Sequence, residues 1–176
     1  MVAAREIALS IDELRGVTQW AADCAARALP LFESAVAVDA RPRSAVSGAL
    51  AFATTGRRTA ELRSQAMAAH AAAREAGQLT ASSAARAAGC AAASPYTHPL
   101  ATPHQSKHIL SPAVYLALAC ESADGHDAAT GDAEIRWAIA NASSTVRNVV
   151  LRFPPRRPGR TRLATLYHAL DIGIRG

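Results

Sequence analysis

Alanine-dense segments, in which apolar residues recur every three or four positions, constrain the fold of this chain more than any other feature. About a quarter of its 176 residues are alanine, while aromatic residues make up only 5%. Alanine has the highest helix propensity because its side chain loses no rotamer entropy, whereas strands favour β-branched and aromatic residues. The sequence therefore predicts an all-α fold, a compact bundle of about six to seven helices in a single domain over residues 1–176.

The first half of the chain contains start and stop signals for four helices. Ser10 and Glu13 have the spacing of a capping box, and Pro30 is expected to kink or break the following helix near Leu29. The second helix is expected from Asp39–Pro42 to Gly56, the third from a Thr59 cap to Gly77, and the fourth from a Thr80 cap to Ala93.

Prolines and polar residues divide the second half. Four prolines between positions 94 and 112 predict an irregular loop that also holds His98, His104 and His108. The stretch from Asp132 to Phe153 has the clearest helical periodicity and predicts one long amphipathic helix. The remaining expected elements are short helices over 113–120 and 163–170, a polar link over 122–131 and a basic connector over 154–162.

Charge and cysteine usage bound the class of protein. The net charge is +5, and Lys107 is the only lysine, so arginine carries almost all of the positive charge. Cys24, Cys90 and Cys120 are widely spaced and odd in number, which predicts small buried thiols in a reducing compartment rather than disulfides. No signal peptide or membrane span is apparent, so we expect a cytoplasmic protein without a membrane partner.

Candidate catalytic and metal-binding residues are sparse. The loop with His98, His104 and His108 lacks a carboxylate, and no HExxH pattern occurs, so a metal site is disfavoured. His70 lies on a predicted core face, where a hydrogen bond to Asp23 is one option. Neither a nucleophile elbow nor a phosphate-binding glycine loop is present. We therefore expect no catalytic residue and no cofactor. A metal-dependent enzyme using the four histidines remains a third class of hypothesis.

Five arginines between Arg152 and Arg162 could contact phosphates. However, no aromatic residues alternate with them for base stacking, and no recognition-helix motif precedes them. A solvated connector is therefore favoured, and nucleic acid is an unlikely partner. Nucleic-acid binding through this Arg-rich C-terminal region is retained as the alternative function.

Several blocks of the sequence carry a family resemblance. The most specific are WAADCAARALPLFE at 20–33 and DARPR at 39–43, and further blocks lie at 68–76, 84–93 and 108–115. They resemble the Imm-5-like family of bacterial, largely actinobacterial, immunity proteins. The resemblance implies a compact helical protein that neutralises a cognate toxin. The family tends to have histidine where this chain has Cys90, so a polar cluster of Asp23, His70 and His108 would lack one member here.

Together these observations predict a non-enzymatic protein-binding module, an immunity protein that occludes a toxin's active cleft. Arginine and aromatic side chains are the usual interface anchors, so Arg156, Arg157, Arg160 and Tyr167 are the candidate contacts. An inhibitor that mimics nucleic acid would be acidic, so the positive charge makes a basic nuclease a less favoured target.

Overall fold

The computed structural model describes residues 5–176, which form eight α-helices and one short 3₁₀ helix. Over this range no strand occurs, and an isolated antiparallel bridge joins Glu6 to Leu100. The predicted all-α class is confirmed, with one or two more helices than expected; residues 1–4 of the expected domain lie outside the described residues. The helices are α1 (Ile11–Ala35), α2 (Arg41–Thr55), α3 (Ala60–Glu75), α4 (Leu79–Ala93), η1 (Ser94–Tyr96), α5 (Pro103–Ala123), α6 (Ala128–Ala140), α7 (Ser144–Val150) and α8 (Arg162–Arg175).

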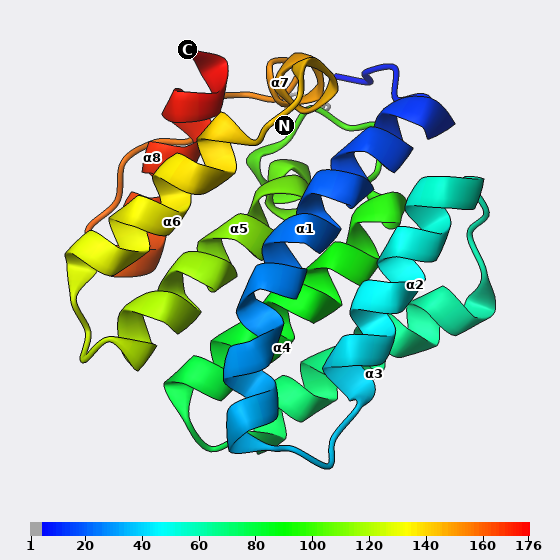
Figure 1. Ribbon diagram of the computed structural model, residues 1–176. Helices are drawn as coiled ribbons and strands as arrows, with labels where there is room; N and C mark the ends of the chain where they lie inside the picture. The colour runs from blue at the N-terminus through cyan, green and yellow to red at the C-terminus, as the bar shows by residue number, and fades with distance from the viewer. Residues whose placement is uncertain (1–4) are drawn as a thin grey trace.

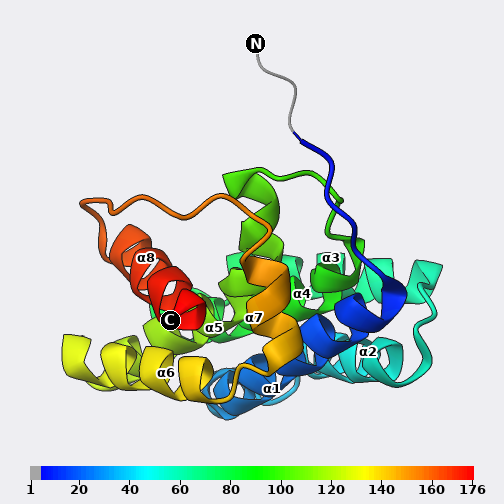
Figure 2. The same cartoon turned by 90° about the horizontal axis from the view of Figure 1, so that it is seen from above.

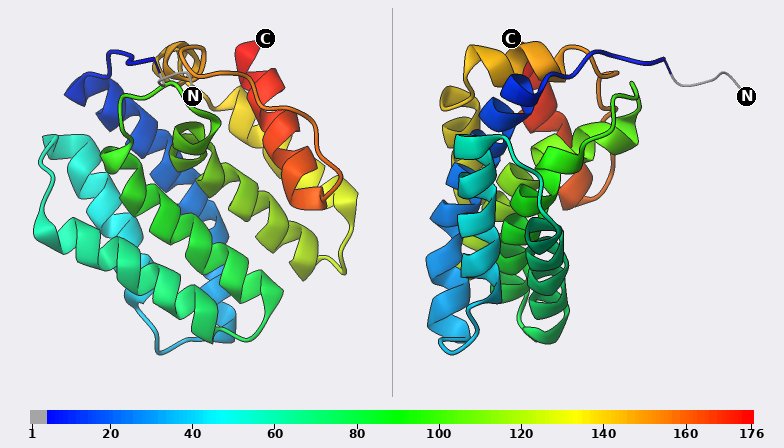
Figure 3. Two further views of the ribbon diagram at one scale, coloured as in Figure 1. Left: turned by 180° about the vertical axis from the view of Figure 1, so that it is seen from behind. Right: turned by 90° about the vertical axis from the view of Figure 1, so that its right-hand side faces the viewer.

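The helices form two packed layers with α4 at their centre. Helices α1 and α2 lie side by side on one face, and α3 and α4 lie on the other (Figure 1, Figure 3). Helix α4 packs against α1, α2, α3 and α5. Helix α5 in turn packs against α6 and α8. Figure 2 shows the segment between α7 and α8 arching over the outside of the molecule. One hydrophobic core connects all of these helices.

Small side chains allow α4 to occupy this central position. Seven of its alanines, together with Ser83 and Gly89, are buried. An alanine methyl group adds little width to a helix, so neighbouring backbones can approach closely and remain densely packed. Phe32, Phe52 and Phe153 are the largest of the fully buried side chains in the core. The alanine content that predicted helices therefore also sets how tightly they pack.

Two predictions for the first half of the chain need correction. Helix α1 continues through Pro30 to Ala35 and does not break near Leu29. Pro30 removes one backbone bond close to the helix end, while Leu29 and Phe32 on either side are buried and hold the last turn against the core. Helix α4 starts at Leu79 rather than at a Thr80 cap. The Ser10 capping box, the Thr59 cap and the left-handed Gly56 that follows α2 are confirmed.

The irregular loop predicted over 94–112 is wrong for most of its length. Ser94–Tyr96 form the 3₁₀ helix, and α5 begins at Pro103, which follows the capping residue Thr102. Proline suits the first turn of a helix because no intrahelical partner exists there for an N–H group. Pro112 lies inside α5, which continues to Ala123. The histidines expected in a loop are therefore partly on a helix.

The long amphipathic helix predicted from Asp132 to Phe153 is two helices. Helix α6 starts four residues earlier, after its cap Asp127, and ends at Ala140. Ser143 then caps α7 by accepting a hydrogen bond from the backbone of Val146. Because the apolar spacing continues from α6 into α7, the sequence pattern did not reveal Ser143 as the cap of a second helix. Helix α8 is also longer than expected, and the basic connector precedes it as predicted. No helix within residues 5–176 has the length and apolar character needed to span a bilayer.

Candidate partner-binding surface

Two arginines flanking the basic connector join distant helices. Arg152 donates hydrogen bonds to both carboxylate oxygens of Glu13 at the start of α1. This guanidinium holds the pKa of Glu13 at about 2, below its usual 4.5. Arg162 donates to Glu121 and Asp132, both at 2.8 Å, and so links α8 to α5 and α6. These side chains are already engaged within the fold and have little capacity left for a partner.

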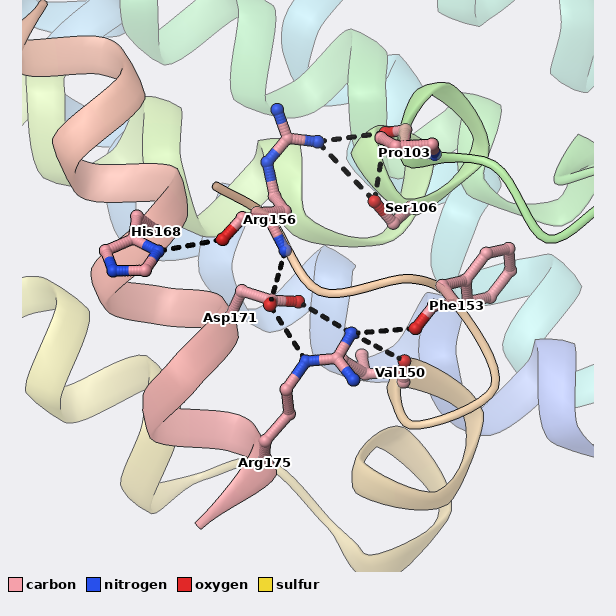
Figure 4. Close-up of polar contacts among 8 residues, drawn as sticks. All are labelled: Pro103, Ser106, Val150, Phe153, Arg156, His168, Asp171 and Arg175. Carbon is pink, nitrogen blue, oxygen red and sulfur yellow. Dashed lines mark hydrogen bonds and ion pairs between the residues drawn. The ribbon is translucent and has the colours of Figure 1, made fainter. Parts of the chain in front are cut away.

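Arg156 and Tyr167, two of the expected partner contacts, also have internal partners, and Figure 4 shows those of Arg156. The Arg156 guanidinium donates to the Pro103 carbonyl at 2.9 Å and lies over the Tyr167 ring, 4.6 Å from its centroid. Tyr167 is 5% exposed, and its hydroxyl is 2.5 Å from Ser111 Oγ. The expectation that Tyr167 anchors a partner is therefore wrong, because its ring is part of the core.

A buried carboxylate fixes the connector to α8. Asp171 is fully buried and accepts hydrogen bonds from Arg175 at 2.8 and 3.1 Å (Figure 4). It also accepts one from the backbone N–H of Arg156 at 3.0 Å. Arg175 donates in addition to the carbonyl oxygens of Val150 and Phe153. A buried charge is tolerated only with such full pairing, so this cluster is a structural element.

Only Arg157 and Arg160 of the expected contacts are exposed and unpaired. Within residues 5–176 neither forms a hydrogen bond or an ion pair. The connector therefore consists of inward-facing arginines that stabilise the fold and two outward-facing ones at its tip. Residues 155 and 157–161 are exposed, while Arg156 and Arg162 tie the connector to the fold.

The histidines expected near one another are partly brought together. His104 and His108 lie four residues apart on α5, and their rings meet edge to face with centroids 5.7 Å apart. Burial, followed by the charges of His104 and His98, lowers the pKa of His108. Among residues 5–176, no group of three His, Cys, Asp or Glu residues is arranged to hold a metal ion. The pair is a surface cluster of imidazoles.

The expected polar cluster of Asp23, His70 and His108 is not assembled within the described chain. Asp23 is exposed on α1, where it accepts a hydrogen bond from Gln19 at 2.9 Å. His70 instead packs on Gly89 of α4, where an added Cβ would lie 2.9 Å from the imidazole ring. Burial, followed by two nearby arginines, lowers the pKa of His70. The option of an Asp23–His70 hydrogen bond is therefore wrong.

The three cysteines are poor candidates for nucleophiles. Burial raises the pKa of the Cys90 thiol to about 12 and that of Cys120 to about 11, and it also raises that of Cys24. A thiol with a raised pKa stays protonated at neutral pH, and the thiolate is the reactive form. Cys24 is therefore a small core side chain, while Cys90 and Cys120 are partly exposed thiols.

A hollow of about 770 Å³ lies between the first half of α3 and the segment around η1. Its walls include two arginines, a methionine, an aromatic ring, a histidine and a proline: Arg58, Arg63, Met67, Tyr96, His98 and Pro99. No residue of the described chain that lines it is acidic. The N-terminal end of α3 borders it, and the helix dipole there favours negative charge.

Local contacts hold the rim of the hollow in place. The Arg63 guanidinium lies 4.8 Å from the centroid of the Tyr96 ring, whose hydroxyl donates to the Thr59 carbonyl at 3.0 Å. Arg58 donates through Nε to the Pro95 carbonyl at 2.8 Å. Its remaining N–H groups, and all of those of Arg63, have no acceptor within residues 5–176. Both guanidinium groups are therefore positioned but free to bind.

Met67 is a contact residue that the sequence patterns did not single out. It lies on α3, and its side chain is 67% exposed. Methionine, tyrosine and arginine are enriched at the centres of protein interfaces. The sequence did contain a signal for this surface. Arg57 and Arg58 lie next to the start of α3, and Met67 lies on an otherwise polar face of that helix. The hollow thus has the composition of a protein-binding site.

Comparison with known proteins gives one match. The family model described as Imm-5 like putative immunity protein matches residues 8–145. Searches of curated proteins and of solved structures find no match. The matched range contains every residue of the hollow and stops before the basic connector and α8.

Proposed function

We propose that this chain, which belongs to the Imm-5 like putative immunity protein family, is a non-enzymatic protein-binding module that neutralises a bacterial toxin. It would do so by steric occlusion, with its helical surface covering the toxin's active cleft, and we place this action in the cytoplasm. An interface of about 1,600 Å² in total is the usual size for such a complex. A rigid helical surface loses little entropy on binding, which favours high affinity.

The observation that carries this proposal is the hollow beside α3. It combines exposed arginine and methionine side chains with a half-buried tyrosine, and it lies inside the part of the chain that matches the family. Arg156 and Tyr167 have internal partners, so the proposed contact surface moves from the connector to α3. Arg157 and Arg160 remain as candidate contacts at a separate site.

The alternative of nucleic-acid binding through residues 152–162 is less favoured. Arg152, Arg156 and Arg162 donate to protein carboxylates or carbonyls, so they are not free to contact phosphates. Two exposed arginines without a stacking platform would give only weak, strongly salt-dependent binding. The net charge of +5 also favours a toxin with an acidic or neutral cleft over a basic nuclease.

A test begins with the genes that neighbour the one encoding this chain. The C-terminal domain of an adjacent large secreted toxin would be expressed with and without this protein. We expect rescue of growth and co-elution of the two proteins as one complex. A toxin domain that kills equally in the presence of this protein, and elutes separately from it, would contradict the proposal.

A further inference from the structure

We propose that the hollow beside α3 is the docking site for an acidic segment of the partner protein, one in which carboxylates flank an apolar side chain. This inference rests on the proposed protein-binding function and specifies its surface and partner chemistry. It is carried by three features of the hollow: uncompensated positive charge, an exposed apolar floor and prepositioned donor groups.

The charge of the hollow is one-sided. Arg58 and Arg63 line it, Arg57 lies next to it in sequence, and no acidic residue of the described chain is in its wall. The nearest carboxylate along α3, Glu61, lines the neighbouring hollows on the side of α2 and accepts a hydrogen bond from Gln65. The field of the hollow is therefore positive and selects a negatively charged occupant.

A lysine and several histidine ring nitrogens extend the set of polar groups beyond the hollow. His98 belongs to its wall and also lies close enough to His108 to lower the pKa of that imidazole. Lys107 and His104 are exposed on the adjoining first turns of α5. An acidic segment longer than the hollow would therefore meet further donor groups where it extends towards the start of α5.

The hollow also offers apolar surface to a ligand, from side chains that line it together with the two guanidinium groups. Met67 is 67% exposed and lines the hollow together with Pro99 and Tyr96. A flexible methionine adapts to side chains of different shape, which suits a protein surface contact. A purely ionic ligand would gain nothing from this floor, so an apolar residue within the acidic segment fits better.

The donor groups are held in advance of binding. Stacking on Tyr96 restricts Arg63, and the Nε bond to Pro95 restricts Arg58. A planar guanidinium binds a carboxylate through two parallel hydrogen bonds, and prior restriction lowers the entropy lost in forming them. The volume of about 770 Å³ suits a short segment of chain rather than a folded surface.

A nucleic acid is a poorer match for the same surface. The Tyr96 ring is the hollow's one aromatic platform among the described residues, and Arg63 already covers its face. Bases bind such surfaces by stacking on open aromatic faces. We therefore commit to a protein segment and treat an oligonucleotide as a competing outcome of the test.

The test is a titration of the ¹⁵N-labelled full chain with capped peptides, followed by amide chemical shifts. The probe is acetyl-Asp-Glu-Leu-Asp-Glu-amide, and its charge-reversed counterpart uses lysine and arginine. We expect the acidic probe to shift amides within 58–67 and 96–99, and we expect at least a tenfold loss of affinity in the R58E/R63E variant. The matched control is R157E/R160E, which changes the net charge equally at exposed arginines on the connector.

Met67→Asp is the second variant, because its exposed side chain can change without disturbing the core. It should also weaken binding of the acidic probe by repulsion. The proposal is overturned if the acidic probe shifts no amide near α3 and η1, or if both double variants lose affinity equally. It is also overturned if a short single-stranded oligonucleotide shifts the same amides more strongly than the peptide. The toxin rescue experiment is read separately, so failure of the proposed function and failure of this surface give different results.

Discussion

The arginines of the C-terminal region and the arginines beside α3 have similar sequence surroundings but different contacts. Arg152, Arg162 and Arg175 bind carboxylates of other segments or of their own helix. Among residues 5–176, the Arg63 guanidinium stacks on an aromatic ring and has no acceptor, and Arg58 uses one N–H group on a carbonyl. Internal acceptors convert an arginine into a structural residue, and their absence leaves it able to bind a partner. The location of function therefore depends on acceptors, not on the density of arginine.

The largest effect should follow from removing the buried acceptor of the C-terminal region. Asp171→Ala leaves Arg175 as an unpaired charge and is expected to lower the free energy of unfolding by about 3–5 kcal/mol. Urea unfolding followed by circular dichroism measures this. The control is Asp12→Ala, whose carboxylate is 85% exposed and should cost about 1 kcal/mol or less. Equal losses in the two variants would mean that Asp171 does not hold the connector.

A smaller effect is expected from Arg156, which separates the inward and outward arginines of the connector. Arg156→Ala removes the hydrogen bond to Pro103 and the stacking on Tyr167, so it should cost about 1–2 kcal/mol. Its neighbour Arg157 is exposed, and Arg157→Ala should change stability by about 0.5 kcal/mol or less. If the two substitutions cost the same in thermal unfolding, the connector is solvated throughout, as the sequence suggested.

The Glu13–Arg152 pair makes a pH-dependent contribution to stability. Because the folded-state pKa of Glu13 is about 2 and its usual value is 4.5, the stabilisation is complete above that usual value and is lost as pH falls from 4.5 towards 2. Glu13→Gln should cost about 1 kcal/mol at neutral pH, and the difference from the parent protein should shrink over this window. Glu61→Gln, at a carboxylate without an ion pair in the described chain, is the control. A difference that stays constant with pH would exclude this linkage.

The smallest effect should come from the rim of the hollow. Tyr96→Phe removes one hydrogen bond to Thr59 but keeps the ring under Arg63, so it should cost about 0.5 kcal/mol. Binding of the acidic probe peptide should be unchanged in this variant, whereas Tyr96→Ala should weaken it. Weaker binding in the phenylalanine variant would mean that the hydroxyl, and not the stacked arginine, contacts the partner.

Local sequence signals predicted the helices well because caps and apolar spacing act within a few residues. The Ser10 box, the Thr59 cap and Gly56 lie where their patterns predicted. The break between α6 and α7 was missed because the apolar spacing continues across it, and Ser143 was not recognised as a cap. The loop predicted before Pro112 was wrong because prolines at a helix start and inside a buried helix are both tolerated here.

The candidate site was harder to predict because it depends on long-range pairing. Nothing near Arg152 in sequence indicates that Glu13 is its partner, since 139 positions separate them. The connector therefore resembled a binding segment although two of its four arginines, Arg156 and Arg162, are internally paired. The hollow combines residues of α3 with residues 96–99, which follow α4 in the sequence. Only the fold brings these two segments together.

The most direct test of the account compares two matched double variants, R58A/R63A and R152A/R162A, in equilibrium urea unfolding. Each removes two arginines, so the change in net charge is the same. We predict a loss of about 1 kcal/mol or less for the first, since only a stacking contact and one neutral-acceptor hydrogen bond, partly buried, disappear. We predict about 3 kcal/mol or more for the second, since charged hydrogen bonds between distant helices are lost. Equal losses, or a larger loss in R58A/R63A, would contradict the division between structural and partner-binding arginines.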